Sequence, residues 1–311
     1  MTTNDPTTSN SGASSRGSHQ LATSAECKRK WAFHYRKKLK ILGEPKFRLG
    51  GTLIHSSLAI LYGQRLIDNG GKIPDWWKDE SLDVQLAKEG AGYPELIQYA
   101  REIYDAYEKM WWQGAAAEPW EPTHVEEEFR ATVGELDPGG EDRTLDSEVV
   151  TCRTDLVVRH KDTGHLWIVD HKTKGGGYGG KGADRLPAWG DGGEYALSWQ
   201  ANINLHLIRL RLPHENVRGF IVNRVKRMPP YDFDRHILHV SPEVYKTVPS
   251  VVRAQVATER EIDQMLAAGK HPPPSYWTCM GRFGWCDYIS ICNADTVDER
   301  NSVIESKFKV G

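Results

Sequence analysis

The sequence predicts a single α/β domain, because segments with helical and with strand-like hydrophobic patterns alternate along most of its 311 residues. No internal repeat and no clear break in this succession marks a second domain. Hydrophobic residues make up 39% and charged residues 26% of the chain, a balance typical of globular proteins. A chain of this length can bury a substantial core.

The first half of the chain is predicted to be mainly helical. Residues 1–20 are rich in Ser, Thr and Asn and are expected to form a disordered tail. A helix is expected to open at Gly50-Gly51-Thr52, where Thr52 is placed to cap it. A second helix is expected over 94–113, after an irregular stretch at 70–92 that is punctuated by Gly, Pro and Trp.

The second half is predicted to supply the sheet, with helices at 194–212 and 242–268. A Gly-rich segment at 173–193 is expected to be a mobile loop. It contains a Gly-x-x-x-x-Gly-Lys pattern, but Gly182 replaces the Ser or Thr of a phosphate-binding loop, so nucleotide binding is rejected. The predicted strands lie near 122–133, 147–159, 166–172, 217–225 and 232–240.

Composition excludes several classes of protein. No stretch approaches the roughly 18 to 20 consecutive apolar residues that span a bilayer, so a transmembrane protein is excluded. The first 20 residues lack the apolar core of a secretory signal, and five cysteines are an odd number for a disulfide framework. These features favour a reducing cytoplasm. The net charge of −2 provides no global basic field, so any nucleic-acid affinity must come from local patches.

One such patch is the segment 27–48, which contains nine Lys or Arg residues and Glu44 as its single acid. Trp31, Phe33 and Tyr35 are interleaved with these cations. The pattern fits a phosphate-contacting surface with stacking aromatic rings. It equally fits the solvated face of an amphipathic helix, and the sequence leaves both interpretations open.

The most informative pattern is a predicted hairpin of two apolar strands, 154–158 and 166–172. A polar turn, Lys161-Asp162-Thr163-Gly164, joins them. If His160 pairs with His165, side-chain alternation places Asp155 directly opposite Asp170.

Like charges that face each other across a sheet are destabilising, so Asp155 and Asp170 require a partner. A divalent cation between them would supply it, since Mg²⁺ is commonly held by one or two carboxylates with phosphate and water. Lys172 lies on the same face as Asp170 and could orient or deprotonate an attacking water. The alternative is an exposed strand end with scattered charges.

The cysteines suggest a second metal site. Cys279, Cys286 and Cys292 cluster near the carboxyl terminus, and Cys27 lies 252 positions earlier than Cys279. Four such thiols could hold an iron–sulfur cluster or Zn²⁺, or could be isolated thiols. Cys152, on the hairpin, is most simply a core residue.

These motifs together resemble the PD-(D/E)XK nuclease superfamily, over residues 21–295. Asp155 followed by Asp170-His171-Lys172 resembles its signature, most closely in the RecB-like branch of CRISPR-associated, AddB-type and phage-encoded exonucleases. The segment from Gly51 to His55 resembles that branch's Gly-x-x-x-His motif. Gln200, whose helical spacing points it inward, resembles the glutamine of its Gln-x-x-x-Tyr motif, although Asn204 stands in place of the tyrosine.

The resemblance implies a restriction-endonuclease-like core, with a mixed central sheet flanked by helices, over residues 21–311. It implies that His55, Asp155, Asp170 and the backbone carbonyl of His171 bind one or two Mg²⁺ or Mn²⁺ ions. Lys172 would activate water, and Gln200 would position Lys172 or the DNA. The triplet Glu126-Glu127-Glu128 is left outside the site, as a solvated strand edge.

The resemblance also implies a [4Fe–4S] cluster held by Cys27, Cys279, Cys286 and Cys292, with Zn²⁺ as the alternative. Such a cluster would join the basic segment 27–48 to the Cys-rich segment 275–295.

The predicted function is that of a metal-dependent DNA exonuclease, acting in recombination, repair or phage DNA processing. Its expected partner is single-stranded DNA or DNA with free ends, with a helicase or recombinase as a further candidate partner and no membrane. One rival is a non-catalytic DNA-binding scaffold with a degenerate nuclease core and a metal-cluster staple. Another is a zinc-stapled enzyme that acts on a different phosphate ester.

Overall fold

The computed structural model describes eight stretches of the chain, and they divide between two compact units. The first unit contains residues 45–129 and 152–245, and the second contains residues 15–44, 130–151 and 246–311. The described stretches are residues 16–43, 46–77, 81–113, 118–174, 196–227, 229–238, 240–281 and 284–311.

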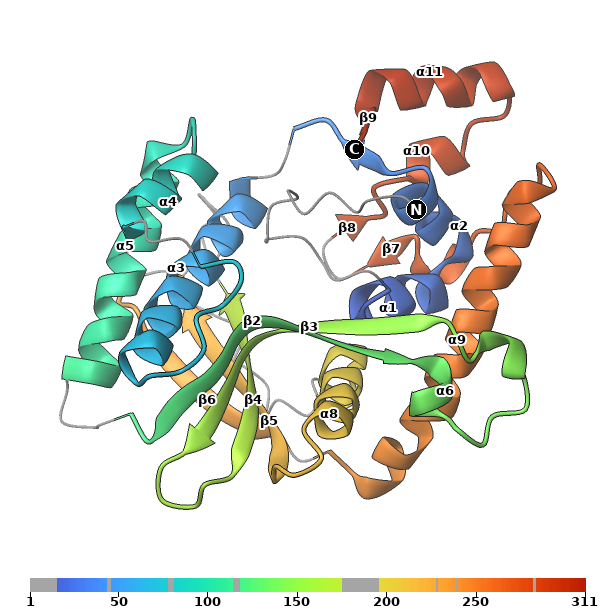
Figure 1. The fold of residues 1–311 in the computed structure, drawn as a ribbon. Helices are drawn as coiled ribbons and strands as arrows, with labels where there is room; N and C mark the ends of the chain where they lie inside the picture. The colour runs from blue at the N-terminus through green and yellow to red at the C-terminus, as the bar shows by residue number, and fades with distance from the viewer. Residues whose placement is uncertain are drawn as a thin grey trace. The chain divides into compact units, whose positions relative to one another are not determined.

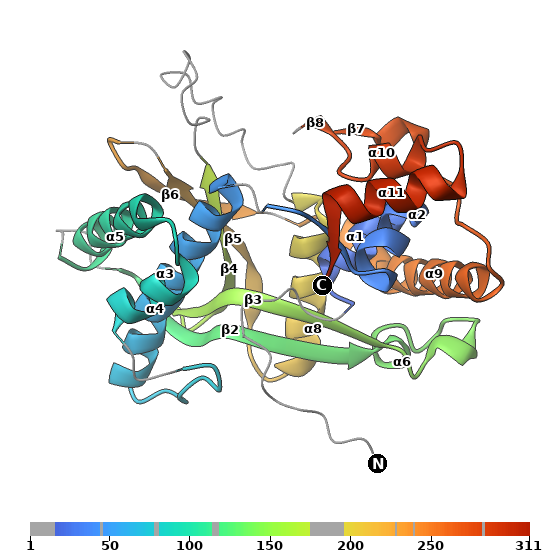
Figure 2. The same ribbon diagram turned by 90° about the horizontal axis from the view of Figure 1, so that it is seen from above.

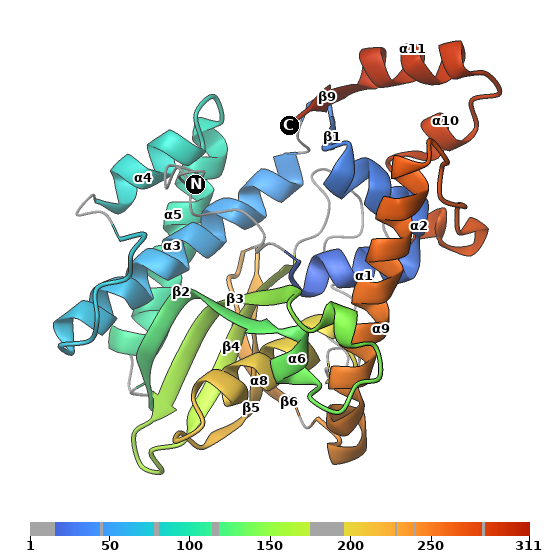
Figure 3. The ribbon, with the colours of Figure 1, turned by 45° about the vertical axis from the view of Figure 1, so that its right-hand side comes forward.

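The first unit is built on a five-stranded mixed sheet, as Figures 1 and 3 show. The strands follow the order β2-β3-β4-β5-β6. Strand β4 runs parallel to β5, whereas β3 is antiparallel to β4 and β6 is antiparallel to β5. This confirms the predicted α/β class with a mixed central sheet. The strands are β2 (Trp120–Thr132), β3 (Val149–His160), β4 (Leu166–Lys174), β5 (Val217–Lys226) and β6 (Phe233–Leu238).

Helices cover both faces of this sheet. On one face, buried side chains such as Leu53 and Leu58 of α3 (Lys46–Asp68) share a core with Val169 and Ile221 of the sheet. Helices α4 (Leu82–Glu89) and α5 (Pro94–Glu108) add to the same core, and a π-helical turn, Lys109–Gln113, follows α5. On the opposite face lies α8 (Trp199–Arg211), which follows the described end of β4 by 25 residues and contacts β5. The sheet therefore separates two packing layers.

Two predictions for this unit are wrong in detail. Helix α3 begins six residues before Thr52, and the Thr52 hydroxyl donates to the carbonyl of Arg48 at 3.3 Å instead of capping the helix. The stretch predicted as irregular contains α4, whose start is capped by Ser81, and Leu86 of α4 is fully buried. Two buried leucines in eight residues are too weak a periodic signal to predict a helix from sequence.

The second unit gathers segments from both ends of the chain (Figure 2). Its longest helix is α9 (Pro242–Ala267), and β1 (Leu39–Ile41) pairs antiparallel with β9 (Phe308–Val310). Its other elements are α1 (Ser18–Glu26), α2 (Lys28–Trp31) with the π-helical turn Ala32–Arg36, α6 (Val133–Leu136), the 3₁₀ turns Arg143–Leu145 and Tyr276–Thr278, β7 (Met280–Gly281), β8 (Gly284–Trp285), α10 (Ile289–Cys292) and α11 (Val297–Lys307). No helix in the described stretches is long and apolar enough to cross a membrane.

Part of the predicted tail belongs to this unit. Residues 18–20, assigned to the tail on their polar composition, form the first turn of α1. The Glu259 carboxylate of α9 is fully buried and accepts hydrogen bonds from Gln20 Nε2 at 3.2 Å, Ser24 Oγ at 3.2 Å and Trp31 Nε1 at 3.0 Å. Polar residues at the amino terminus thus satisfy an interior carboxylate, which composition cannot reveal.

The first two aromatic residues of the basic segment 27–48 fit an amphipathic helix with a solvated face and do not fit a stacking surface. Trp31 is fully buried and Phe33 is 2% exposed, so neither ring is available for stacking. Two of the cations face α9, where Lys28 pairs with Glu261 and Arg36 with Asp263. The Gly-rich segment lies almost wholly outside the described residues, since 175–195 are not among them.

Candidate active site

The hairpin of β3 and β4 has the predicted register. Leu156 pairs with Val169, and at the other end the backbone N–H of His160 donates to the carbonyl of His165 at 2.9 Å. Gly164 closes the turn with a positive φ of 68°, a conformation that glycine adopts readily. The same register, continued by one residue beyond Leu156, places Asp155 opposite Asp170.

The Asp155 carboxylate lies at the point where the β3–β4 pairing ends. Its Oδ2 accepts the backbone N–H of His171 at 2.6 Å and lies 3.5 Å from Nδ1 of His55. Burial raises the pKa of Asp155 above its ordinary value; His55 opposes that rise, and the negative charge of Asp170 adds to it. The carboxylate is therefore held in a place that disfavours its charge unless a cation is near.

Asp170, Lys172 and Gln200 form a closed triangle. Lys172 Nζ lies 2.6 Å from Asp170 Oδ2 and donates to Gln200 Oε1 at 2.8 Å, while Gln200 Nε2 donates to Asp170 Oδ1 at 2.5 Å. Alternation along β4 points both charged residues toward α8. Ser198, whose Oγ accepts the N–H of Ala201, caps α8 and so places Gln200 in the first turn of that helix.

His55 reaches the site because α3 passes close to the end of β4. A Cβ atom at Gly51 would lie 3.4 Å from Thr173 Oγ1, so a side chain there would press on β4. His55 stands one helical turn after Gly51 and thus faces Asp155. The Gly-x-x-x-His spacing therefore has a physical explanation in this chain. Gly51 lets α3 pack close to β4, and this packing brings the His55 ring to Asp155.

His171 points to the opposite side of the sheet, where a buried polar network surrounds its ring. The ring stacks on Tyr62 with centroids 5.8 Å apart, and Asn223 Nδ2 contacts His171 Nδ1 at 2.7 Å. Asn223 also donates to the hydroxyl of Tyr107 at 3.0 Å. We call the connected set the His171 network: His171, Asn223, Tyr107, Tyr62, Arg235 and Glu118.

The charged end of the His171 network lies at Arg235. Its guanidinium donates to the Tyr62 hydroxyl at 2.9 Å, the Tyr107 hydroxyl at 3.1 Å and Glu118 Oε2 at 2.8 Å. Burial lowers the pKa of His171 well below its ordinary value, and the charges of His55, Arg235 and Lys172 lower it further. The imidazole is therefore neutral at neutral pH, and Nδ1 can accept the Asn223 amide hydrogen.

Glu126 lies near the two aspartates, although its triplet was expected to be a solvated strand edge outside the site. Burial raises its pKa well above the ordinary value, and the charges of Asp155 and Asp170 are among the further causes. Glu126 has a φ of +49°, rare for a residue with a side chain, and this interrupts the regular alternation of β2. The run of three glutamates was the available signal, but alternation alone could not identify which of them faces inward.

Asn204, which stands where the resemblance expects tyrosine, lies one turn after Gln200 on α8. Its side chain is 2% exposed, and its Oδ1 has no hydrogen-bond partner in the described part of the chain. It does not belong to the Asp170–Lys172–Gln200 triangle.

The donor chemistry at the aspartates fits a hard divalent cation. Carboxylate oxygens from Asp155 and Asp170 and an imidazole nitrogen from His55 are ligands that Mg²⁺ or Mn²⁺ accepts. Asp170 Oδ2 is buried and accepts no hydrogen bond from the described residues; its contact is the ion pair with Lys172. As the described side chains lie here, however, no three His, Cys, Asp or Glu residues enclose a metal position.

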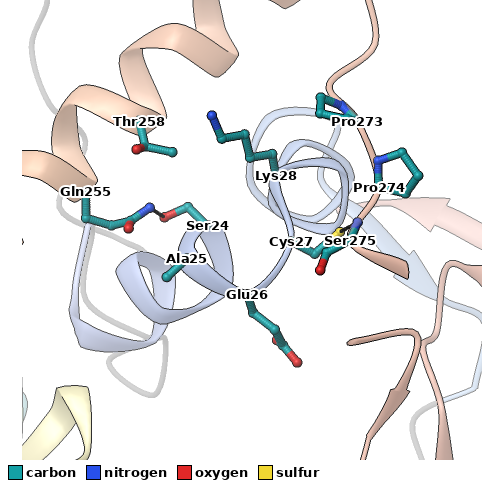
Figure 4. A pocket seen from close by; sticks show the side chains of 10 residues that line it. All are labelled: Ser24, Ala25, Glu26, Cys27, Lys28, Gln255, Thr258, Pro273, Pro274 and Ser275. Carbon is teal, nitrogen blue, oxygen red and sulfur yellow. Dashed lines mark hydrogen bonds between the residues drawn. The ribbon is translucent and has the colours of Figure 1, made fainter. Parts of the chain in front are cut away.

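The predicted thiol cluster lies within the second unit. Cys27 Sγ accepts the backbone N–H groups of Lys30 and Ser275, each at 3.4 Å, and Figure 4 shows it beside Ser275 in a pocket between α1, α9 and residues 273–275. The backbone N–H of Cys286 donates to the carbonyl of Cys279 at 2.7 Å. Two backbone N–H groups therefore point at the Cys27 sulfur.

Cys286 and Cys292 each lie close enough to two other cysteines of this unit for charge on those thiols to affect them. Burial raises the pKa of both Cys286 and Cys292, and charge on Cys27 raises each of them further. All five cysteines are free thiols, and the described thiols do not converge at metal-binding geometry. Cys152 is 2% exposed on β3 in the first unit, where burial raises its pKa, as expected for a core residue.

Comparison with known proteins adds a family. A sequence model of the PD-(D/E)XK nuclease superfamily matches residues 18–293. None of the curated proteins matches the chain.

Two solved structures are similar at low identity. One, from Eubacterium rectale and provisionally named an exonuclease, is 13% identical, with 91% of this chain and 88% of that chain covered and a TM-score of 0.46. The other, SSO0001, is also 13% identical, with 66% and 72% covered and a TM-score of 0.29.

Proposed function

The chain belongs to the PD-(D/E)XK nuclease superfamily, and from that premise we propose that it is a metal-dependent DNA exonuclease of the RecB-like branch. The observation that carries the proposal is the triangle of Asp170, Lys172 and Gln200 beside Asp155. A scaffold that only bound DNA would gain nothing from two facing carboxylates and an ammonium in one partly buried corner, since like charges there destabilise the fold.

Each residue of the site has a distinct role in this proposal. Asp155, Asp170, His55 and the backbone carbonyl of His171 would hold one or two Mg²⁺ or Mn²⁺ ions. A bound ion of this kind supplies Lewis acidity and lowers the pKa of water. Gln200 fixes Lys172 and Asp170 relative to each other, because it bonds to both.

Lys172 is the residue proposed to act directly on the attacking water and on the phosphoryl group. Its ammonium lies on the same face as Asp170 and can orient the attacking water or stabilise negative charge that develops on the phosphoryl oxygens. Removing such a group typically reduces the rate about 10²- to 10⁴-fold. The proposal therefore makes Lys172 catalytic and Gln200 a positioning residue.

The broader context is also part of the proposal. We place the activity in DNA recombination, repair or phage DNA processing in a cytoplasm, with DNA ends as substrate and a helicase or recombinase as a candidate partner. We further propose that Cys27, Cys279, Cys286 and Cys292 hold a [4Fe–4S] cluster, with Zn²⁺ as the alternative. The two N–H groups directed at Cys27 Sγ support this assignment.

The test is a cleavage assay on end-labelled linear and circular DNA, single- and double-stranded, with Mn²⁺ or with EDTA. We expect wild type to degrade linear DNA only with Mn²⁺, and Lys172→Ala and Asp170→Ala to lose this activity while remaining folded. Lys161→Ala, in the exposed turn of the same hairpin, is the matched control and should cleave normally. Metal-dependent cleavage retained by purified Lys172→Ala protein would refute the proposal.

A further inference from the structure

Three large aromatic side chains lie exposed on the second unit. Trp277 is 95% exposed, Tyr276 79% and Trp285 64%. Rings of this size contribute strongly to stability when they are buried, so three of them exposed within ten residues are not explained by packing. A concentrated exposed apolar surface indicates an interaction site.

The rings project from a short, anchored segment. Met280 pairs with Trp285 across β7 and β8, and the backbone N–H of Cys286 donates to the carbonyl of Cys279 at 2.7 Å. The hydroxyl of Thr278 donates to the carbonyl of Glu26 at 3.4 Å, which attaches the Tyr276–Thr278 turn to the end of α1. No ring contact in the described part of the chain joins the three rings to one another, so each has a face to offer.

Positive charge surrounds this segment. Residues 27–43 contain seven Lys or Arg and no Asp or Glu, in a chain whose net charge is −2. Arg29 Nε donates to the carbonyl of Pro272 at 2.8 Å, and the Tyr288 hydroxyl donates to the carbonyl of Leu39, between Lys38 and Lys40, at 2.8 Å. Residues 27–43 therefore contact the chain on both sides of residues 276–285, at Pro272 before them and at Tyr288 after them.

The pKa of His271, which lies shortly before the three aromatic residues in sequence, also reflects nearby positive charge. Burial lowers the pKa of His271, and the positive charges of Lys37, Arg300 and Arg29 lower it further. Three of the seven cations pair with acids: Lys28 with Glu261, Lys30 with Glu26 and Arg36 with Asp263. Four cations of residues 27–43 remain beyond these three pairs. The balance of charge is positive, so the complementary partner is an anion.

We propose that Tyr276, Trp277 and Trp285 stack against unpaired bases of single-stranded DNA, while Lys and Arg side chains of residues 27–43 contact its phosphates. Unpaired bases expose the flat faces that such rings bind, whereas a duplex keeps those faces stacked inside. The proposal deepens the proposed nuclease function, on which its choice of DNA rests, by assigning the single strand its own binding surface. A protein partner would satisfy the rings but would need an acidic surface of its own.

The test measures binding without cleavage. Fluorescence anisotropy of a labelled oligo(dT) strand, with no added divalent cation, gives the dissociation constant of the full-length protein. We expect Trp277→Ala to weaken binding about 5- to 150-fold, the range measured when one stacking ring is removed. Trp277→Phe keeps a ring and should bind nearly as wild type does. Val297→Ala, at a side chain 66% exposed on α11 of the same unit, is the control and should leave binding unchanged.

A second binding substrate separates base stacking from phosphate contacts. It is a duplex whose two ends are closed by non-nucleotide linkers, so that it offers phosphates but no unpaired bases. Its affinity should be the same for wild type and Trp277→Ala. Equal losses on single strand and closed duplex, or no loss on either, would refute the proposal, and the latter would leave the surface to a protein partner. Cleavage is measured separately with Mn²⁺. Protein that binds through Trp277 but never cleaves would refute the nuclease and leave the stacking surface in place.

Discussion

Gln200 connects the two charged residues of the candidate active site, and its side chain has no other described partner. Its amide donates to Asp170 and accepts from Lys172, so both depend on it for orientation. We expect Gln200→Ala to lower kcat about 10- to 100-fold with little change in DNA affinity, because a misplaced catalytic group can cost about 100-fold.

The measurement for Gln200→Ala is single-turnover cleavage with Mn²⁺, together with binding in its absence. Gln98→Ala, an exposed glutamine on α5 that bonds Glu102, is the matched control. If Gln200→Ala changed DNA affinity alone, Gln200 would be a DNA contact and not a positioning residue.

Asn223 acts on the same strand from the opposite layer. Its fully buried amide bonds His171, the residue between Asp170 and Lys172 on β4. Asn223→Leu conserves the volume but leaves His171 Nδ1 and one side of Tyr107 without a donor, so we expect a loss of about 1–3 kcal/mol in the free energy of unfolding. Urea denaturation checks this value.

Cleavage kinetics show whether Asn223 only stabilises the fold or also positions Asp170 and Lys172 through His171. We expect kcat of Asn223→Leu to fall while KM for DNA stays constant, under conditions where the variant is fully folded. Unchanged kcat would restrict the His171 network to stability.

The sequence predicted the acidic pair and Lys172 because alternation along a hairpin is a local rule with few exceptions. It predicted His55 and Gln200 only through the family resemblance. Glu126 was missed because a single residue with positive φ interrupts the alternation of β2. The His171 network was missed because its six members come from six segments far apart in sequence, namely α3, α5, the residues before β2, β4, β5 and β6, and no local pattern marks them.

At the scale of elements, α9 is tied to α1 and α2 by the buried Glu259 carboxylate. Burial raises the pKa of Glu259 above its ordinary value of 4.5, although Arg16 and three hydrogen bonds lower it. Between the ordinary and the raised pKa, the folded protein holds a proton that the unfolded chain has released. The free energy of unfolding therefore falls as pH rises through this window.

Glu259→Gln removes this titration. We expect the stability of wild type, relative to Glu259→Gln, to increase as the pH is lowered from neutral toward 4.5. Urea denaturation of both proteins at several pH values measures the difference, and Glu261→Gln, an exposed neighbour on α9, is the control. A difference independent of pH would show that Glu259 does not titrate in this range.

Elements with a long periodic or alternating pattern were predicted well, as β4 and α9 illustrate. The failures are short or governed by tertiary partners: α4 has eight residues, and α1 is held by a carboxylate more than 230 positions away. The basic segment shows a third cause, since Trp31 and Phe33 belong to the core while the cations around them are partly or fully exposed. Composition averages over these two faces.

At the scale of the molecule, the second unit is assembled from three distant parts of the chain. A metal cluster between Cys27 and the three carboxyl-terminal cysteines would close a very long loop, which removes conformational entropy from the unfolded chain. We expect protein isolated without oxygen to be brown and to absorb near 400 nm, and Cys27→Ala to lose this absorption and melt at a lower temperature.

Cys152→Ala is the matched control for the cluster, because Cys152 lies on β3 and should leave the absorption intact. Colourless wild type with about one zinc per chain would replace the iron–sulfur assignment by zinc. Colourless protein without bound metal would refute both.

The Lys172 ammonium is a built-in counter-ion for the Asp170 carboxylate, and a cation from solution can take its place. The ammonium lies 2.6 Å from the carboxylate and is joined to the same strand, so it occupies that position at a high effective concentration without loss of translational freedom. Any cation from solution must displace a counter-ion that cannot diffuse away. Once displaced, the ammonium stays within reach of whatever anion arrives next, and its charge becomes available to the phosphate of a substrate.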